Sequence, residues 1–302
     1  MSLLSNSSTS AKEPSGARPN RVSIGRIAVY GSLVLASIYC LAPLYVMLAT
    51  SLKSTQEVAS STIFALPTHP TFEAWVKAWD SACTGAECEG IKVGFWNSVI
   101  LTVPSVIIAI VVASINGYSL VNWKFRGGEL MFAILIAGSF VPYQVFIYPL
   151  VRITSALGIY STPLAVVFVH TVLSMPLMTL LFRNYYSTLP PELFKAARVD
   201  GAGFWTAYFR IMLPMSMPVT GVAIILLSTV IWNDFLVGLV FAGQKYAPMT
   251  VQLNNIVNSI QGTREYNVNM AATILTAAVP LSIYVFSGKL FVRGIAAGAV
   301  KG

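Results

Sequence analysis

Six long stretches of the chain contain no Asp, Glu, Lys or Arg, and they limit its fold more than any other feature. They cover residues 27–52, 93–123, 130–151, 153–182, 211–233 and 270–288, each 19 to 31 residues long. A helix needs roughly 20 apolar residues to cross the hydrocarbon core of a bilayer. The stretches are too long for membrane strands and lack strict apolar/polar alternation. The sequence therefore predicts an all-α, polytopic membrane protein with six transmembrane helices.

Composition and charge support this class. Apolar residues make up 56% of the chain and charged residues only 10%, whereas a soluble chain is about 25% charged. A soluble enzyme, a disordered chain, a collagen-like chain and a disulfide scaffold are thereby excluded. With the N-terminus inside, the inner segments carry 13 basic and 4 acidic residues, and the outer segments carry 6 and 7. The net charge of +8 thus splits into +9 inside and −1 outside, which predicts an N-in/C-in topology.

The spans divide the chain into expected regions. No small-residue cleavage site follows the first span, so we expect it to stay as a helix. Gly158, Ser161 and Pro163 place a helix break between the third and fourth spans. The expected regions are a disordered cytoplasmic tail (1–25), a six-helix transmembrane domain (26–295) with external loops 53–92 and 242–269 and a cytoplasmic loop 183–213, and a C-terminal cytoplasmic tail (296–302).

The cytoplasmic loop has a distinctive sequence, which from Leu189 reads LPPELFKAARVDGAGFWTAYFRIMLP. Pro190 and Pro191 end one helix and open another, and Glu192 lies in the first turn, where its charge suits the helix dipole. Gly201 ends this helix, and 204–209 can form a second one. From these residues alone, an amphipathic helix on the lipid headgroups remains an alternative.

The same stretch resembles the EAA loop of permeases from importer-type ATP-binding-cassette (ABC) transporters. In that family the helix docks into a cleft on the cytoplasmic ATPase, so the resemblance implies an ATPase-coupling role here. Lys195 departs from the motif, because the family has glutamate at this position. The matching positions are Ala196, Ala197, Asp200, Gly201, Ala202, Ile211, Leu213 and Pro214, with Glu192 retained upstream.

Most of the chain, residues 25–295, is similar to the carbohydrate branch of this family, and to its maltose-transporter-like half. The resemblance rests on Pro43-Leu44, Ser51-Leu52-Lys53, Asn97-Ser98, the segment 157–162 and the segment 232–235. It implies the type I ABC importer permease fold and a bacterial inner membrane. It also implies four kinds of partner: a second homologous permease, two ATPase subunits, a periplasmic sugar-binding protein and the lipid bilayer.

The sequence shows no recognisable catalytic motif. No phosphate-binding loop of the GxxxxGKS/T type is present, and no HExxH, CxxC pair or Ser-His-Asp set stands out. We therefore expect a non-catalytic subunit without a metal site or a cofactor of its own, and with no nucleic-acid partner. ATP and Mg are expected to bind the partner ATPase.

Polar residues in the spans suggest a substrate pathway. Trp232 could offer a ring face to a sugar, and Asn233 or Asp234 could accept hydroxyl hydrogens. The alternative is that Asp234 caps the next segment. Gln144 follows Pro142, and this pair indicates either a packing kink or a substrate contact.

The external loop contains Cys83 and Cys88, which can close a small ring as a disulfide in an oxidising compartment. The insertion that carries them looks like glucose/mannose-type permeases, so we expect a monosaccharide such as glucose or mannose. An ABC permease for oligosaccharide, polyol or glycerol phosphate is an alternative. A stand-alone secondary transporter or channel is another, but it would require an internal repeat or ionisable residues within the spans.

Overall fold

The computed structural model of the chain describes residues 24–84, 87–123, 125–258 and 264–299, without the side chains of 24 and 288–299. The chain divides into two units, Met1–Val46 and Met47–Gly302. The N-terminal tail expected at 1–25 lies outside the described residues up to position 23. Of the C-terminal tail expected at 296–302, residues 296–299 continue the last helix, and 300–302 lie outside the described part.

All described residues of the first unit belong to helix α1 (Ile24–Ser51), which continues into the second unit. The hydroxyl groups of Ser32 and Ser37 donate to the carbonyls of Val29 and Leu33, both at 2.8 Å. These bonds return to the helix's own backbone, so the two hydroxyls need no partner elsewhere. The helix predicted at 27–52 is confirmed.

Among the described residues, four helices are long and apolar enough to cross a membrane, and the total rises to six when each of two bent pairs counts as one span. The four are α1, α4 (Lys92–Asn122), α7 (Pro163–Thr188) and the segment Tyr266–Ser287 of α14 (Tyr266–Ala299). One bent pair joins α5 (Gly128–Ser139) to η1 (Tyr143–Phe146) and α6 (Ile147–Ala156). The other joins α9 (Phe204–Ala207), η2 (Tyr208–Met212) and α10 (Leu213–Met215) to α11 (Met217–Asn233).

The third span differs most from the prediction. Its two halves, α5 and α6, are bent by 105° about a break at Pro142. Proline has no backbone N–H, so it cannot continue the hydrogen bonding of a helix. The stretch 130–151 is therefore not one straight helix, and the bend is much sharper than the expected kink. The helix break predicted at Gly158, Ser161 and Pro163 is confirmed: α6 ends at Ala156, Gly158 and Ser161 adopt left-handed conformations with φ of 70° and 62°, and the fourth span begins at Pro163.

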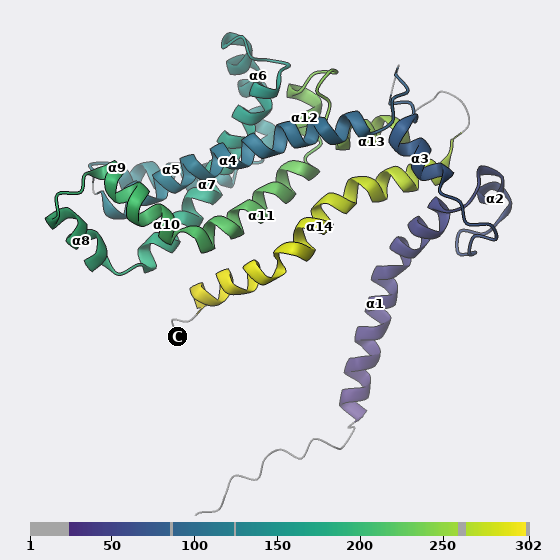
Figure 1. The fold of residues 1–302 in the computed structure, drawn as a ribbon, viewed down its shortest axis with the longest axis horizontal. Helices are drawn as coiled ribbons and strands as arrows, with labels where there is room; N and C mark the ends of the chain where they lie inside the picture. Colours follow the sequence, from purple (N-terminus) through teal and green to yellow (C-terminus); the bar gives the residue numbers. More distant parts are fainter. Residues whose placement is uncertain (1–23, 85–86, 124, 259–263, 300–302) are drawn as a thin grey trace, which may run out of the picture. The chain divides into compact units, whose positions relative to one another are not determined.

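Helices α4 and α7 pack along one another in the centre of the second unit, and α11 packs beside α4 (Figure 1). Gly117 of α4 lies directly against the backbone of α7. A Cβ added there would lie 2.7 Å from the backbone nitrogen of Arg183 and 2.8 Å from the Cβ of Phe182. Such contact between backbones requires a residue without a side chain, as in many membrane helix pairs.

Short helices cover both ends of this pair (Figure 1). At one end lie α8 (Pro191–Val199), α9 and α10. At the other end lie α3 (Glu73–Asp80), α12 (Leu236–Phe241) and α13 (Met249–Val257). We call these the α8 end and the α13 end of the bundle.

The segment expected as an external loop at 53–92 contains two helices, α2 (Thr55–Ser60) and α3. Helix α3 packs against α14 and buries Ala74 and Ala78. These alanines recur every fourth residue, so they form one small apolar side of the helix. The segment is therefore a folded layer on the α13 end.

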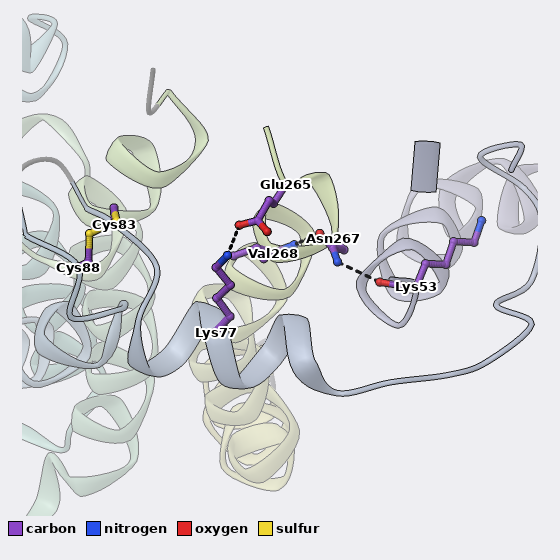
Figure 2. A network of polar contacts seen from close by, with 7 residues as sticks. All are labelled: Lys53, Lys77, Cys83, Cys88, Glu265, Asn267 and Val268. Carbon is purple, nitrogen blue, oxygen red and sulfur yellow. Dashed lines mark hydrogen bonds and ion pairs between the residues drawn. A yellow bond between two sulfur atoms is a disulfide. The ribbon is translucent and has the colours of Figure 1, made fainter. Parts of the chain in front are cut away.

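Polar contacts fix this layer to the first turn of α14 (Figure 2). The ammonium group of Lys77 pairs with the Glu265 carboxylate at 2.5 Å, and the Asn267 amide donates to the Lys53 carbonyl at 3.0 Å. The Lys53 side chain points the other way and donates to Ser61 Oγ at 3.0 Å. The beginning of the layer and the beginning of the last span are thus held together.

The segment expected as a second external loop, 242–269, contains the buried helix α13. The Asn97 side chain at the start of α4 donates to the carbonyls of Lys245 and Ala247, both at 3.1 Å. Ser98 Oγ accepts from the Met249 amide at 2.8 Å. The pair Asn97-Ser98 therefore holds the entry to α13, a role that the sequence does not indicate.

Candidate functional site

Helix α8 forms where the sequence predicts a short helix on the loop 183–213. Pro190 is extended and Pro191 occupies the first turn, where its missing N–H costs nothing. Glu192 lies in the first turn and Arg198 in the last, so each charge suits the adjacent end of the helix dipole. Local sequence is thus sufficient to place and orient α8.

The helix ends at a left-handed glycine. Gly201 has φ of 81°, and the Ala202 amide reaches back to the Ala197 carbonyl at 2.9 Å. Together they make the hydrogen-bonded C-terminal turn that glycine favours. Nothing lies within 4 Å of a Cβ built on Gly201, so the turn itself is open to its surroundings.

Half of the predicted coupling residues are exposed on α8 or on the turn that ends it. The exposed ones are Glu192, Ala196, Asp200 and Gly201, together with the divergent Lys195. Ala197 faces inward and is 7% exposed, and Ala202 is half-buried. The remaining two predicted residues, Leu213 and Pro214, lie apart from this surface in α10.

The inner side of α8 rests on aromatic residues at the end of α4. The ring of Tyr118 lies 6.1 Å from the ring of Phe194, and the Arg198 guanidinium lies 5.5 Å from the ring of Trp123. The sequence does not indicate a role for Tyr118 or Trp123, because no local spacing relates them to a helix about 75 residues further along the chain.

A small cavity of about 170 Å³ separates α8 from the bundle. The side-chain nitrogen of Asn122 is buried there without a hydrogen-bond partner among the described residues. Because of this cavity, α8 is not tightly packed against the bundle on this side, and its close contacts are those with the aromatic rings of Tyr118 and Trp123. Among the lining residues are Asn122, Tyr186, Pro190, Leu193, Phe194 and Met215.

The residues predicted to form a substrate pathway are dispersed. Trp232 is only 4% exposed, its indole N–H donates to the Thr276 carbonyl at 3.2 Å, and its ring packs 5.7 Å from that of Phe95. The predicted contact between Trp232 and a sugar is therefore not present in this conformation, because both the ring and the N–H are engaged in the core. Asn233, the next residue, is exposed.

Asp234 caps the helix that follows it. Its carboxylate accepts from the Val237 amide at 2.7 Å, and its carbonyl accepts from the Thr250 hydroxyl at 2.9 Å. Gln144 is exposed in η1, directly after the break in the third span.

The sulfur atoms of Cys83 and Cys88 are bonded to each other in the structure. Next to them, the Thr84 carbonyl accepts from the Asn255 side chain of α13 at 3.3 Å. The disulfide loop therefore contacts the second external segment as well as following α3. The remaining cysteine, Cys40 of α1, is exposed and free.

We expect this disulfide in the isolated protein. In a tryptic digest without reductant, the peptide that contains both Cys83 and Cys88 should be about 2 Da lighter than its dithiol form. Cys40 provides an internal control, since its thiol should react with a maleimide before reduction. Modification of all three cysteines without reductant would contradict the prediction.

Comparisons with known proteins place these features in a family. The model for the binding-protein-dependent transport system inner membrane component matches residues 105–297. A probable ABC transporter permease of Pyrococcus horikoshii is 34% identical over 283 residues, which cover 93% of this chain and 99% of that protein. The xylose/arabinose import permease of Haloferax volcanii is 30% identical, with coverage of 91% and 93%.

A solved structure has the same architecture. It is the crystal structure of a bacterial ABC transporter involved in the import of the acidic polysaccharide alginate. One of its chains aligns with a TM-score of 0.76 at 18% identity, covering 90% of the chain described here and 99% of that chain. The likeness confirms the predicted helical fold.

Proposed function

The chain belongs to the family of inner membrane components of binding-protein-dependent transport systems, and from this membership we propose that it is the permease subunit of an ATP-driven sugar importer. It is a multi-pass inner-membrane protein without catalytic activity, and a partner ATPase hydrolyses ATP. A substrate-binding protein is the other partner. The observation that carries the proposal is the placement of α8, which exposes Glu192, Ala196 and Asp200 at one end of the membrane helices.

The proposed complex contains more than one membrane subunit. It pairs this chain with a second, homologous permease, and two ATPase subunits bind ATP and Mg. With the N-terminus inside, the α8 end faces the cytoplasm and the α13 end faces outward, toward the binding protein. This orientation is supported by the excess of basic residues in the segments assigned to the inside.

Coupling proceeds through contact rather than through chemistry in this chain. The ATPase moves α8, and the helices shift between outward-open and inward-open states. ATP binding and hydrolysis act by favouring one state over the other, which requires different contacts in each.

The proposed substrate is a monosaccharide such as glucose or mannose. The folded insertion with Cys83 and Cys88 supports this choice, and one relative is named as an importer of two pentoses. Asn233, Asp234 and Gln144 are proposed to border the sugar pathway, since each lies at a helix break: Asn233 and Asp234 between α11 and α12, and Gln144 directly after Pro142. Half-helix ends and unwound backbone at such breaks supply hydrogen-bonding groups inside the membrane. Trp232 could join them only by leaving the core.

Co-purification tests the proposal directly. In mild detergent we expect the chain to bring with it an ATPase and a second six-helix protein. Reconstituted with the binding protein, this complex should take up labelled sugar only with ATP, and a panel of glucose, mannose, maltose, sorbitol and glycerol phosphate should identify the substrate. The variant Asn233→Ala should raise the sugar concentration needed for half-maximal uptake while leaving basal ATP hydrolysis unchanged.

Two results would contradict the proposal. One is uptake by this chain alone in liposomes without ATP, which would indicate a secondary transporter or channel. The other is isolation of the chain without any ATPase, from membranes in which sugar uptake is active.

A further inference from the structure

Three hydroxyl groups meet inside the apolar core near the α8 end. Ser114 of α4, Tyr186 of α7 and Tyr208 of η2 are 0%, 1% and 1% exposed. Ser114 Oγ lies 2.7 Å from the Tyr186 hydroxyl, and the Tyr208 hydroxyl donates to Ser114 Oγ at 3.1 Å. We call these three residues the hydroxyl cluster.

The cluster joins elements that are distant in sequence. Ser114 is 72 positions from Tyr186 and 94 positions from Tyr208. Alanine and phenylalanine would fill the same space without polar atoms, whereas a buried hydroxyl costs free energy unless it is hydrogen-bonded. Hydrogen bonds, unlike apolar packing, also fix one relative position of the helices that carry the partners.

The cluster is the centre of a wider attachment. The Tyr118 hydroxyl of α4 donates to the Phe204 carbonyl at 3.2 Å, and the Tyr185 hydroxyl of α7 donates to the Met215 carbonyl at 2.8 Å. Both ends of the segment between α8 and α11 are thus fastened to the two central helices. Tyr208 of the hydroxyl cluster begins a π-helical turn. Such turns are found frequently at functional sites.

The segment 204–215 is hydrogen-bonded to α4 and α7, whereas α8 is separated from the bundle by a cavity. A cavity of about 170 Å³ lies behind that helix, so α8 itself has room to move relative to the bundle. The segment 204–215 has no such freedom, because its hydroxyl and carbonyl groups are bonded to α4 and α7. A displacement that reaches this segment must move those helices or break the bonds.

We propose that the hydroxyl cluster transmits the movement of α8 to the central helices, and that Ser114, Tyr186 and Tyr208 act as positioning residues in coupling. The inference rests on the proposed function, since it presupposes that α8 receives the movement.

The decisive variant is Tyr208→Phe, which removes one hydroxyl and keeps the ring. In the complete complex, reconstituted with binding protein, we expect the ratio of sugar transported to ATP hydrolysed to fall about 5- to 10-fold. The labelled sugar is glucose, or whichever sugar of the panel the wild-type complex takes up. Ser114→Ala should give a similar fall. The double variant should lose little more than Ser114→Ala alone, because Ser114→Ala already removes the bond from Tyr208 as well as the contact with Tyr186.

Ser105→Ala is the matched control. Ser105 lies on the same helix and is also 0% exposed, and within the described part of the chain its hydroxyl bonds only to the Leu101 carbonyl of its own helix, at 2.6 Å. Its replacement should leave the ratio unchanged. A role limited to stability would lower uptake and hydrolysis together in the cluster variants, and that outcome would overturn the inference.

The measurement separates this inference from the function on which it rests. If the wild-type complex shows no ATP-driven uptake, the proposed function fails. If the wild type is coupled and the Tyr208→Phe complex keeps its full ratio, only the transmission role of the cluster fails. Should Ser114→Ala not fold, Tyr186→Phe supplies the second variant, since it also removes a cluster hydroxyl and keeps its ring.

Discussion

Replacing Gly201 with tryptophan is expected to uncouple sugar uptake from ATP hydrolysis. Gly201 ends α8 at φ of 81°, a conformation that costs an L-residue about 1–2 kcal/mol. No atom lies within 4 Å of a Cβ at this position, so the indole projects onto the surface proposed to meet the ATPase. Uptake should fall about tenfold or more, while ATP hydrolysis by the assembled complex persists. Parallel measurement of both rates in proteoliposomes checks this.

Two further variants separate the loss of uptake caused by backbone strain at position 201 from the loss caused by the bulk of the tryptophan. Gly201→Ala introduces the backbone strain without the bulk, so its loss of uptake should be intermediate. Gly203→Ala is the control, because Gly203 is also exposed and open but has an ordinary φ of −73°. Normal uptake by an intact complex that carries Gly201→Trp would count heavily against docking through this turn.

The spans were predictable because few backbone conformations are stable inside a bilayer. A chain segment in hydrocarbon must satisfy its own backbone hydrogen bonds, so a charge-free stretch of sufficient length is a helix. The stretch 93–123 predicted α4 to within one residue. Helix α8 was also predictable, because its boundaries are set locally by Pro190, Pro191 and Gly201.

The helices in the external segments were not predictable in the same way. Helices α3 and α13 are 8 and 9 residues long, and helices so short are stabilised mainly by tertiary packing. Their partners, α14 and the start of α4, are distant in sequence. The hydroxyl cluster escaped prediction for the same reason, since Ser114 and Tyr208 are 94 positions apart. Burial of Trp232 could not be foreseen either, because a tryptophan at the end of a span suits a pathway, an interface or a core.

The contact between α4 and α7 at Gly117 predicts a large effect of substitution there on the stability of the fold. We expect Gly117→Ala to destabilise the fold, because the new Cβ would lie 2.7 Å from the Arg183 nitrogen and 2.9 Å from the Phe182 carbonyl carbon. Backbone atoms of a packed helix cannot yield as a flexible side chain can. Overpacking of this kind typically costs about 1–3 kcal/mol. For a domain of this size each kcal/mol lowers the midpoint of thermal unfolding by about 2–4 °C, which unfolding in detergent can resolve.

The same substitution at Gly221 of α11 isolates the cause. No atom lies within 4 Å of a Cβ at that position, so only the higher helix propensity of alanine acts, which favours the helix by about 1 kcal/mol. Gly221→Ala should therefore unfold at or above the wild-type temperature, and Gly117→Ala below it, although both add one methyl group to a span. Because Ser114 lies one turn before Gly117 on α4, separation of α4 from α7 should also loosen the hydroxyl cluster. Equal midpoints for the two variants would mean that the α4–α7 contact is not as close as the structure has it.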